Sequence, residues 1–175
     1  PAAEEPVPDP PEPTAPPTED NYQVSGAISV LPEAILDADT NNPDSEPGNN
    51  NTRALAQPLL LPGTVVGHLN EPQTGVEGAT FDAGDLDDFF LLENVGGSVA
   101  TLFIAETDAA DFDLFLYNST GDVIDFSSGI DSFEQLTIPD NGLYFLNVFA
   151  YSGASNYVLA LGNTVRRQSR GEVVP

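Results

Sequence analysis

Apolar and polar residues alternate with a period of two through the middle of the chain, and this alternation predicts β-strands. The pattern is clearest where Phe112, Leu114 and Leu116 occupy every second position. Strand character is expected in four stretches: residues 99–104, 112–117, 143–150 and 157–161. No amphipathic helix of useful length interrupts them. The sequence therefore predicts an all-β fold.

Turn-forming residues separate these stretches at short intervals. Asn141-Gly142 lies between two apolar runs and predicts a β-hairpin, because both residues tolerate positive φ. Ser152-Gly153 predicts a further turn, which would separate the last two strands. Short strands with turns at this spacing are typical of an antiparallel, jelly-roll-like β-sandwich.

The composition is uneven along the chain and indicates where the core lies. All ten Phe residues fall between Phe81 and Phe149, whereas eight of the 16 prolines fall within the first 17 residues. A Pro- and Glu-rich stretch buries too little apolar surface to offset its ordering entropy. We therefore expect four regions: a disordered spacer over residues 1–21, a strand (Tyr22–Leu31) plus acidic lead-in over 22–53, the β-sandwich over 54–163, and a linker towards a following domain over 164–175.

The charge balance excludes several classes of function. Against 28 acidic residues the chain has 4 basic ones, which gives a net charge of −24. Binding to nucleic acid or to anionic lipid needs clustered Lys and Arg, so we expect neither partner. Cysteine is absent, which excludes disulfides and thiolate metal sites. No apolar run reaches the length that membrane insertion requires.

The acidic residues form two clusters with the spacing of convergent ligands. Between Ala54 and Val165 there are sixteen acids and no Lys or Arg, so few carboxylates can have a salt-bridge partner. The first cluster is Asp37, Asp39, Asn41, Asp44 and Glu46, and the second is Asp82, Asp85, Asp87 and Asp88. Oxygen-only donors favour calcium over zinc or copper. The alternative is that these acids form a solubilising or salt-adapted surface.

Catalytic motifs are missing. No Gly-x-Ser-x-Gly sequence occurs, and the single histidine, His68, has no serine motif to nominate a partner, so we interpret it as structural. A pair of carboxylates could act as in a glycosidase, but acids are so abundant that the sequence singles out no pair. Tyr144, Tyr151 and Tyr157 are candidates for an aromatic binding face or for ordinary core and cross-strand positions.

Several motifs, taken in order, resemble the bacterial pre-peptidase C-terminal domain. They are Glu46-Pro47 with Asn50-Asn-Thr52 and Ala56, then Asp85-Leu-Asp-Asp-Phe-Phe-Leu-Leu92, Ala110-Asp-Phe-Asp-Leu-Phe-Leu-Tyr-Asn118 with Gly121, Glu134, Gly142-Leu-Tyr-Phe-Leu-Asn-Val148, Tyr151-Ser-Gly153 and Tyr157-Val-Leu159. The resemblance implies a non-catalytic β-sandwich attached to a secreted protease. Similar domains of collagenases hold calcium between the lead-in and the loop before the first Asp-Asp-Phe strand.

Carried over by position, the resemblance implies ligands at Glu46, Asn50 or Asn51, Asp85 and Asp88, with Asp87 beside them. Asp37, Asp39, Asn41 and Asp44 are the second candidate set for calcium. The final residues, Arg170-Gly-Glu-Val-Val-Pro175, resemble the approach to a subtilisin-like prodomain.

The sequence hypothesis is thus a secreted or cell-surface bacterial domain that is not itself an enzyme. It would be calcium-stabilised and monomeric, and would assist the secretion, folding or substrate engagement of a subtilisin-like serine protease. Its partners would be the catalytic domain of that protease and a protein or polysaccharide substrate. The alternatives are a carbohydrate- or matrix-binding module and a pro-region that regulates the protease.

Overall fold

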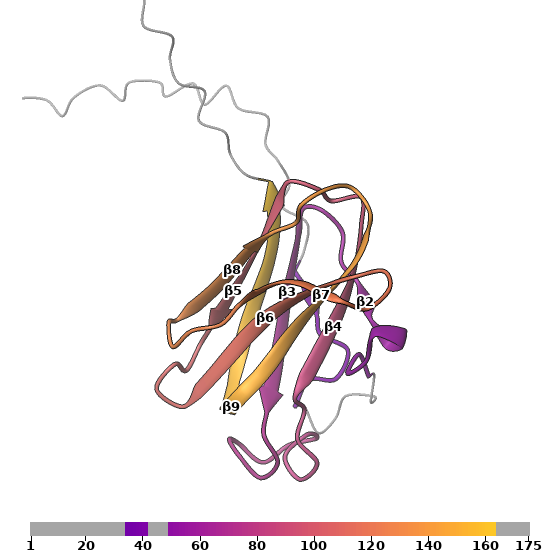
Figure 1. The fold of residues 1–175 in the computed structure, drawn as a ribbon. Coiled ribbons are helices and arrows are strands. Elements are labelled where there is room, and N and C mark those ends of the chain that lie inside the picture. The colour runs from indigo at the N-terminus through magenta and orange to yellow at the C-terminus, as the bar shows by residue number, and fades with distance from the viewer. Residues whose placement is uncertain (1–33, 42–48, 164–175) are drawn as a thin grey trace, which may run out of the picture. The chain divides into compact units, whose positions relative to one another are not determined.

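A computed structural model describes residues 34–41 and 49–163 of the chain, drawn in colour in Figure 1. The expected spacer over 1–21, the expected strand Tyr22–Leu31 and the expected linker over 164–175 lie outside the described residues. Within the described ranges, no helix is long and apolar enough to cross a membrane.

The described residues form nine strands and one short 3-10 helix, so the all-β class expected from the sequence is confirmed. In chain order the elements are β1 (Ile35–Leu36), η1 (Arg53–Leu55), β2 (Gln57–Pro58), β3 (Gly63–Asn70), β4 (Asp87–Glu93), β5 (Ser98–Ile104), β6 (Ala110–Asn118), β7 (Val123–Ser127), β8 (Phe133–Thr137) and β9 (Leu143–Asn163).

The strands form two sheets that share β9 (Figure 1). Sheet A has the order β1-β3-β9-β5-β8, and its part of β9 is residues 154–163. Sheet B contains β2, β4, β6 and β7, with residues 143–153 of β9 between β4 and β6. The long pairings are antiparallel, as expected, but β1 pairs with β3 and β2 with β4 in parallel. Long connections separate both of these pairs, as parallel neighbours require.

Two turn predictions were wrong. Asn141-Gly142 joins β8 to β9, but these strands do not pair with each other: β8 pairs with β5, and β9 begins in sheet B. Ser152-Gly153 does not end a strand, because both residues lie inside β9. Gly153 has φ 77°, and a side chain there would overlap the backbone of Ala109. A glycine at this point therefore lets β9 pass from sheet B to sheet A.

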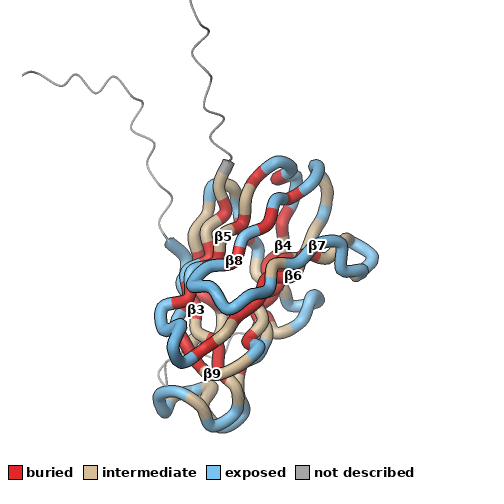
Figure 2. Tube along the Cα trace, turned by 60° about the vertical axis from the view of Figure 1, so that its left-hand side comes forward, coloured by how far each residue is buried: buried red, intermediate tan, exposed pale blue. Residues whose placement is uncertain are grey.

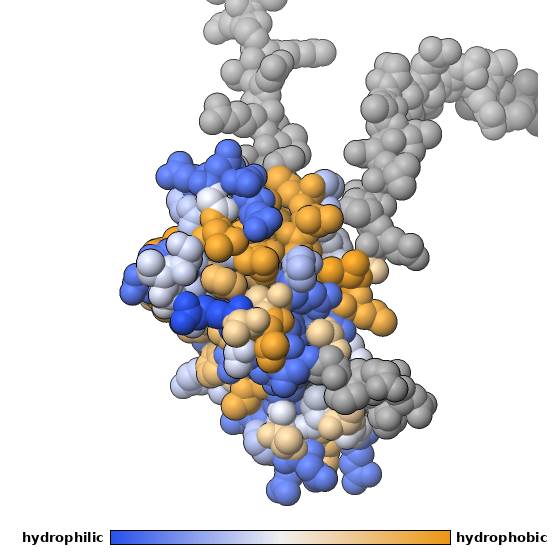
Figure 3. Space-filling model, turned by 90° about the vertical axis from the view of Figure 1, so that its right-hand side faces the viewer, coloured by the Kyte–Doolittle hydropathy of each residue, from blue (hydrophilic) through white to orange (hydrophobic). Residues whose placement is uncertain are grey.

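The core lies between the two sheets. In β6 the predicted alternation holds: Phe112, Leu114 and Leu116 are fully buried, whereas Phe115 and Tyr117 are partly exposed on the outer side. Figure 2 shows buried residues along the central strands and exposed residues on β7, β8 and the turns. Figure 3 views the molecule from its right-hand side in Figure 1, that of β2 and β4, where hydrophobic residues gather in the upper half. On the connection after β2, Leu60 is 78% exposed.

Candidate metal centre

Two distant parts of the chain meet at the site: the lead-in residues 34–41 and the segment that enters β4. Pairing of β1 with β3 places the lead-in, and the backbone N–H of Asp37 continues this pairing by donating to the carbonyl of Val66 at 2.9 Å. On the other side, Asp85 and Asn70 exchange two backbone hydrogen bonds of 2.8 Å just before β4 begins. Both segments are thus fixed to β3 by backbone contacts.

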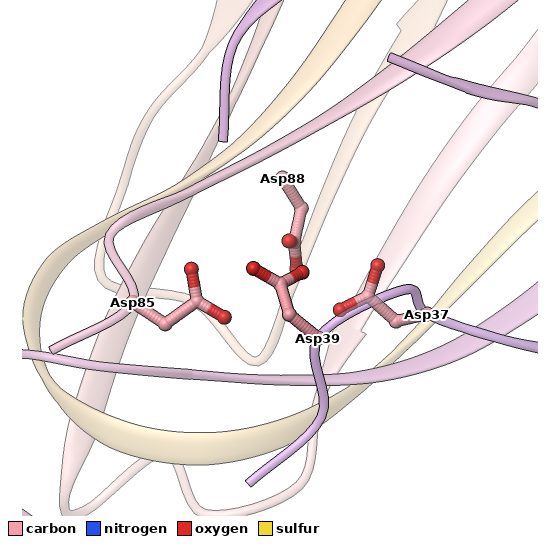
Figure 4. A group of neighbouring side chains, drawn as sticks. All are labelled: Asp37, Asp39, Asp85 and Asp88. Carbon is pink, nitrogen blue, oxygen red and sulfur yellow. The ribbon is translucent and has the colours of Figure 1, made fainter. Parts of the chain in front are cut away.

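Four aspartates from these segments point into one common space, as Figure 4 shows. Asp37 and Asp39 come from the lead-in, Asp85 from the loop before β4, and Asp88 from β4 itself. One carboxylate oxygen from each lies within 4.8 Å of the corresponding oxygens of the other three. Asp37, Asp85 and Asp88 are buried and Asp39 is half-buried.

Two asparagines brace this group of carboxylates. Asn50 donates from Nδ2 to Oδ1 of Asp37 at 2.9 Å, and Asn51 donates from Nδ2 to Oδ1 of Asp85 at 2.9 Å. Each amide therefore holds one carboxylate oxygen and keeps its own Oδ1 free of a partner. We call these six residues, the four aspartates with Asn50 and Asn51, the acidic site.

The core supplies a further contact to the acidic site. Tyr157, which faces inward from β9 and is 1% exposed, donates its hydroxyl hydrogen to Oδ2 of Asp88 at 2.6 Å. Gly67 lies opposite Tyr157 in the β3–β9 pairing, and a side chain on Gly67 would overlap the tyrosine ring. The absence of a side chain at Gly67 thus makes the room that lets Tyr157 reach Asp88.

Each residue of the acidic site has one buried oxygen without a hydrogen-bond partner among the described residues. These atoms are Oδ2 of Asp37, Oδ1 of Asp39, Oδ2 of Asp85, Oδ1 of Asp88, and Oδ1 of Asn50 and Asn51. Buried polar atoms are normally hydrogen-bonded, so six unpartnered acceptors on neighbouring residues need an explanation. A cation satisfies acceptors that no protein donor reaches.

The electrostatics indicate the same missing charge. Burial first, and then the charges of Asp39 and Asp37, raise the pKa of Asp85 to about 8. Burial and the charge of Asp37 raise the pKa of Asp39 to about 6. The pKa of Asp88 lies well above its usual value because of burial first and then the nearby aspartates. Without a counter-ion these carboxylates oppose one another's ionisation.

The donor set fits calcium. Calcium takes six to eight oxygen ligands, including carboxylates and amide carbonyls, whereas magnesium prefers to keep several of its waters. The acidic site brings four carboxylate oxygens within 4.8 Å of one another, and Asn50 and Asn51 beside them each carry an unpartnered amide oxygen. All of these atoms are oxygens, whereas zinc and copper favour nitrogen and sulfur ligands.

The structure joins parts of the two clusters that the sequence treats as separate. Asp37 and Asp39 of one set meet Asp85 and Asp88 of the other, with Asn50 and Asn51 beside them. Asp44 and Glu46 lie outside the described residues. Nothing in the sequence spacing signals that Asp37 and Asp85 become neighbours.

Two candidate ligands lie apart from this group. Asp87 accepts from Nδ2 of Asn147 at 2.8 Å, and it alternates along β4 with the inward-facing Asp88. Asn41 instead ties the lead-in to the loop before β4, because it donates to the carbonyl of Val76 at 2.8 Å and accepts from the backbone N–H of Thr80 at 3.0 Å. Asp82 is exposed.

Tyr157 was missed as a contributor to the site. From the sequence, Tyr157 was a candidate, with Tyr144 and Tyr151, for an aromatic binding face or for core positions. The structure places Tyr157 in the core, whereas Tyr151 is 66% exposed. The three tyrosines therefore do not form one binding face.

The single histidine, His68, lies on β3. Its Nδ1 is 3.1 Å from Oδ1 of Asn156, and burial lowers the pKa of the imidazole.

No protein-family model and no curated protein sequence matches this chain. Among solved structures, the chain is similar to the pre-peptidase C-terminal domain of a collagenase from Bacillus anthracis. The two share 16% identity with a TM-score of 0.47, and the match covers 67% of this chain and 99% of the collagenase domain. It is also similar to PliG of Aeromonas hydrophila, a periplasmic inhibitor of g-type lysozyme, at 13% identity and a TM-score of 0.37, covering 61% of this chain and 95% of that one.

Proposed function

We propose that this domain is a calcium-stabilised, non-catalytic accessory domain of a secreted bacterial peptidase. The observation that carries the metal part is the set of six buried, unpartnered oxygens in the acidic site. The peptidase part is supported by the ordered motifs that resemble the pre-peptidase C-terminal domain, from Glu46-Pro47 to Tyr157-Val-Leu159.

Calcium would act here as a link between two segments. Asp37 and Asp39 belong to the lead-in, which otherwise contacts the sandwich through the two-residue strand β1 and the hydrogen bonds of Asn41. Asp85 and Asp88 belong to the sandwich. A cation that binds only the folded form adds RT ln(1 + [L]/Kd) to stability, about 2.7 kcal/mol at a hundredfold excess over Kd. Calcium outside the cell would therefore complete folding after export.

The metal proposal is tested by titrating calcium, magnesium and terbium into the 175-residue chain. The chain has no tryptophan, and Tyr157 donates to Asp88, so excitation of tyrosine should sensitise the emission of bound terbium. Calcium should displace terbium and raise the Tm, and magnesium should do so much less.

A pair of variants makes this test specific. Asp85→Asn with Asp88→Asn should abolish terbium emission and the calcium-dependent rise in Tm, and should raise the Tm in chelator because two buried, mutually repelling carboxylates are gone. Asp82→Asn removes an exposed carboxylate from the same loop and should change neither. A Tm that ignores both calcium and chelator would refute the metal proposal.

The peptidase proposal has its own test, which does not depend on calcium. The open reading frame that encodes these 175 residues should also encode a peptidase catalytic domain. An open reading frame without one would refute the accessory role and leave the metal proposal intact.

A further inference from the structure

The outer face of sheet A has a row of exposed apolar side chains that crosses all five strands. The members are paired in register from strand to strand: Leu36 with Val66, Val66 with Val158, Val158 with Phe103, and Phe103 with Phe133. Each is at least partly open to solvent, from 37% for Val66 and Val158 to 69% for Leu36. We call this set the apolar row. Figure 2 brings β5 and β8 of this sheet forward.

The strand positions that surround the apolar row carry no charge at neutral pH. The other outward positions on β3, β9, β5 and β8 are Thr64, His68, Asn156, Ala160, Gly162, Val99, Thr101, Gln135 and Thr137. None is Asp, Glu, Lys or Arg, and burial keeps the pKa of His68 below its usual value. The carboxylate that acts on this face is that of Glu106, just beyond β5, whose charge reaches His68. On a chain of net charge −24, a sheet face whose strand positions carry no carboxylate is where another anionic molecule meets little direct repulsion.

We propose that this face pairs with a second copy of the chain through a two-fold axis that runs along β9 at Val158. Such an axis reverses the order of the row, so that the aromatic end of one copy, Phe103 and Phe133, lies over the aliphatic end of the other, Leu36 and Val66. A two-fold interface must be self-complementary, and a row with large side chains at one end and small ones at the other satisfies this requirement.

The surface relief supports this pairing. Leu36, Val66, His68 and Asn156 line an open groove of about 490 Å³ at the aliphatic end of the row. Phe103 and Phe133 are each 50% exposed at the other end, with ring centroids 6.5 Å apart. The two-fold axis places the projecting rings of each copy over the groove of the other.

The association should be weak and should strengthen with salt. Four inter-strand steps of about 4.8 Å make the row roughly 19 Å long. It is only one side chain wide, so it forms a narrow contact, whereas each partner buries ~800 Å² in a standard interface. Two chains of net charge −24 repel each other, and raising the salt shortens the screening length from about 8 Å at 0.15 M to about 3 Å at 1 M. The proposal does not depend on bound metal, since four of the five members lie on β3, β5, β8 and β9.

Sedimentation equilibrium of the 175-residue chain, at protein concentrations up to about 1 mM, tests the proposal. We expect a monomer–dimer equilibrium that shifts towards dimer as the salt rises. Phe103→Ser with Phe133→Ser should abolish the dimer, whereas Phe126→Ser, which removes a 60% exposed ring from sheet B, should leave it unchanged. A monomer under all conditions, or a dimer that survives the first variant, would overturn the proposal.

The position of the axis has a separate test, because the chain has no cysteine. Val158→Cys puts a thiol on the proposed axis, and Val123→Cys puts one at an exposed position on sheet B. A short bismaleimide that spans the ~10 Å between packed sheets should link the Val158→Cys copies efficiently at high salt and the Val123→Cys copies poorly. Equal linking of the two variants would overturn the two-fold arrangement.

Discussion

The hydroxyl of Tyr157 donates a 2.6 Å hydrogen bond to Oδ2 of Asp88, with both residues buried in the sandwich. This bond joins sheet A, where Tyr157 lies, to sheet B, where Asp88 begins the core side of β4. It holds one oxygen of Asp88 and leaves Oδ1 as the unpartnered atom that faces the acidic site. The hydrophobic core and the candidate calcium site therefore share a residue pair.

Tyr157→Phe should weaken both the fold and the calcium response. The ring still fills its place, but Oδ2 of Asp88 loses its donor in a buried site, which costs about 1–3 kcal/mol. Asp88 is then free to turn, so calcium affinity should fall as well. Urea unfolding in calcium and in chelator measures the two effects. Tyr151→Phe, at an exposed position of the same strand, is the control and should stay within about 0.5 kcal/mol of wild type. Equal stability of the two variants would contradict the role given to Tyr157.

Gly67→Ala should displace Tyr157 from Asp88. A Cβ at Gly67 would overlap the ring and hydroxyl of Tyr157, so the ring must shift, at a cost of about 1–3 kcal/mol for overpacking. The shift should also lower calcium affinity, because it moves the donor away from Asp88. Gly162→Ala, a substitution in the same sheet that meets no neighbouring atom within 4 Å, should have neither effect. A stable Gly67→Ala variant with unchanged calcium affinity would show that the site tolerates movement of the ring.

The strands could be predicted from the sequence because their signal is local. Alternation at Phe112, Leu114 and Leu116 reports directly which side of β6 is buried. Turn connections were harder to predict. Asn141-Gly142 favours a tight turn whether or not the two strands that flank it pair with each other. The preference of a dipeptide for a turn says nothing about the partner of each strand, and here β8 pairs with β5 instead.

The candidate site was only partly predictable for a related reason. The residue types that favour calcium can be identified in the sequence. Asp39 and Asp85, however, meet through long-range contacts: β1 pairs in parallel with β3, and Asn41 bonds to the loop before β4. Such long-range register leaves no mark in the spacing of the ligands. Period two gave no signal on β4, because residues 89–92 are apolar at both parities. The structure shows that Asp88 shares the inward side of β4 with Phe90, whereas Asp87 does not.

Calcium binding should weaken as the pH falls below about 8. In the metal-free fold the pKa of Asp85 is about 8 and that of Asp39 about 6, both above the ordinary value of 3.8. The metal-free folded form therefore binds protons more tightly than the unfolded chain, and gains stability as the pH falls through these values. Calcium competes with the same protons.

The calcium-dependent rise in Tm should accordingly be largest at pH 8 and should shrink steadily towards pH 5. Calorimetric titration in two buffers of different ionisation enthalpy should also show protons released on binding at pH 7. Asp82→Asn, outside the acidic site, should leave both curves unchanged. A rise in Tm that is the same at pH 5 and pH 8 would contradict the assignment of these carboxylates as ligands.

Asp113 should give the fold a pH dependence that is separate from the metal. It lies on the outer side of β6 at 7% exposure, and burial, then the charges of Asp111 and Glu134, raise its pKa to about 6. A raised carboxyl pKa destabilises the fold as the pH rises from about 4 to 6, because the unfolded chain ionises first. Asp113→Asn should remove this loss, so the variant should become more stable than wild type across that window and stay more stable at higher pH.

Urea midpoints from pH 4 to 8 measure the difference in stability. The contribution of the acidic site cancels in this difference, because both proteins contain the site. Asp125→Asn, on the exposed strand β7, is the control. A difference between Asp113→Asn and wild type that does not change with pH would show that Asp113 ionises as freely in the fold as in the unfolded chain.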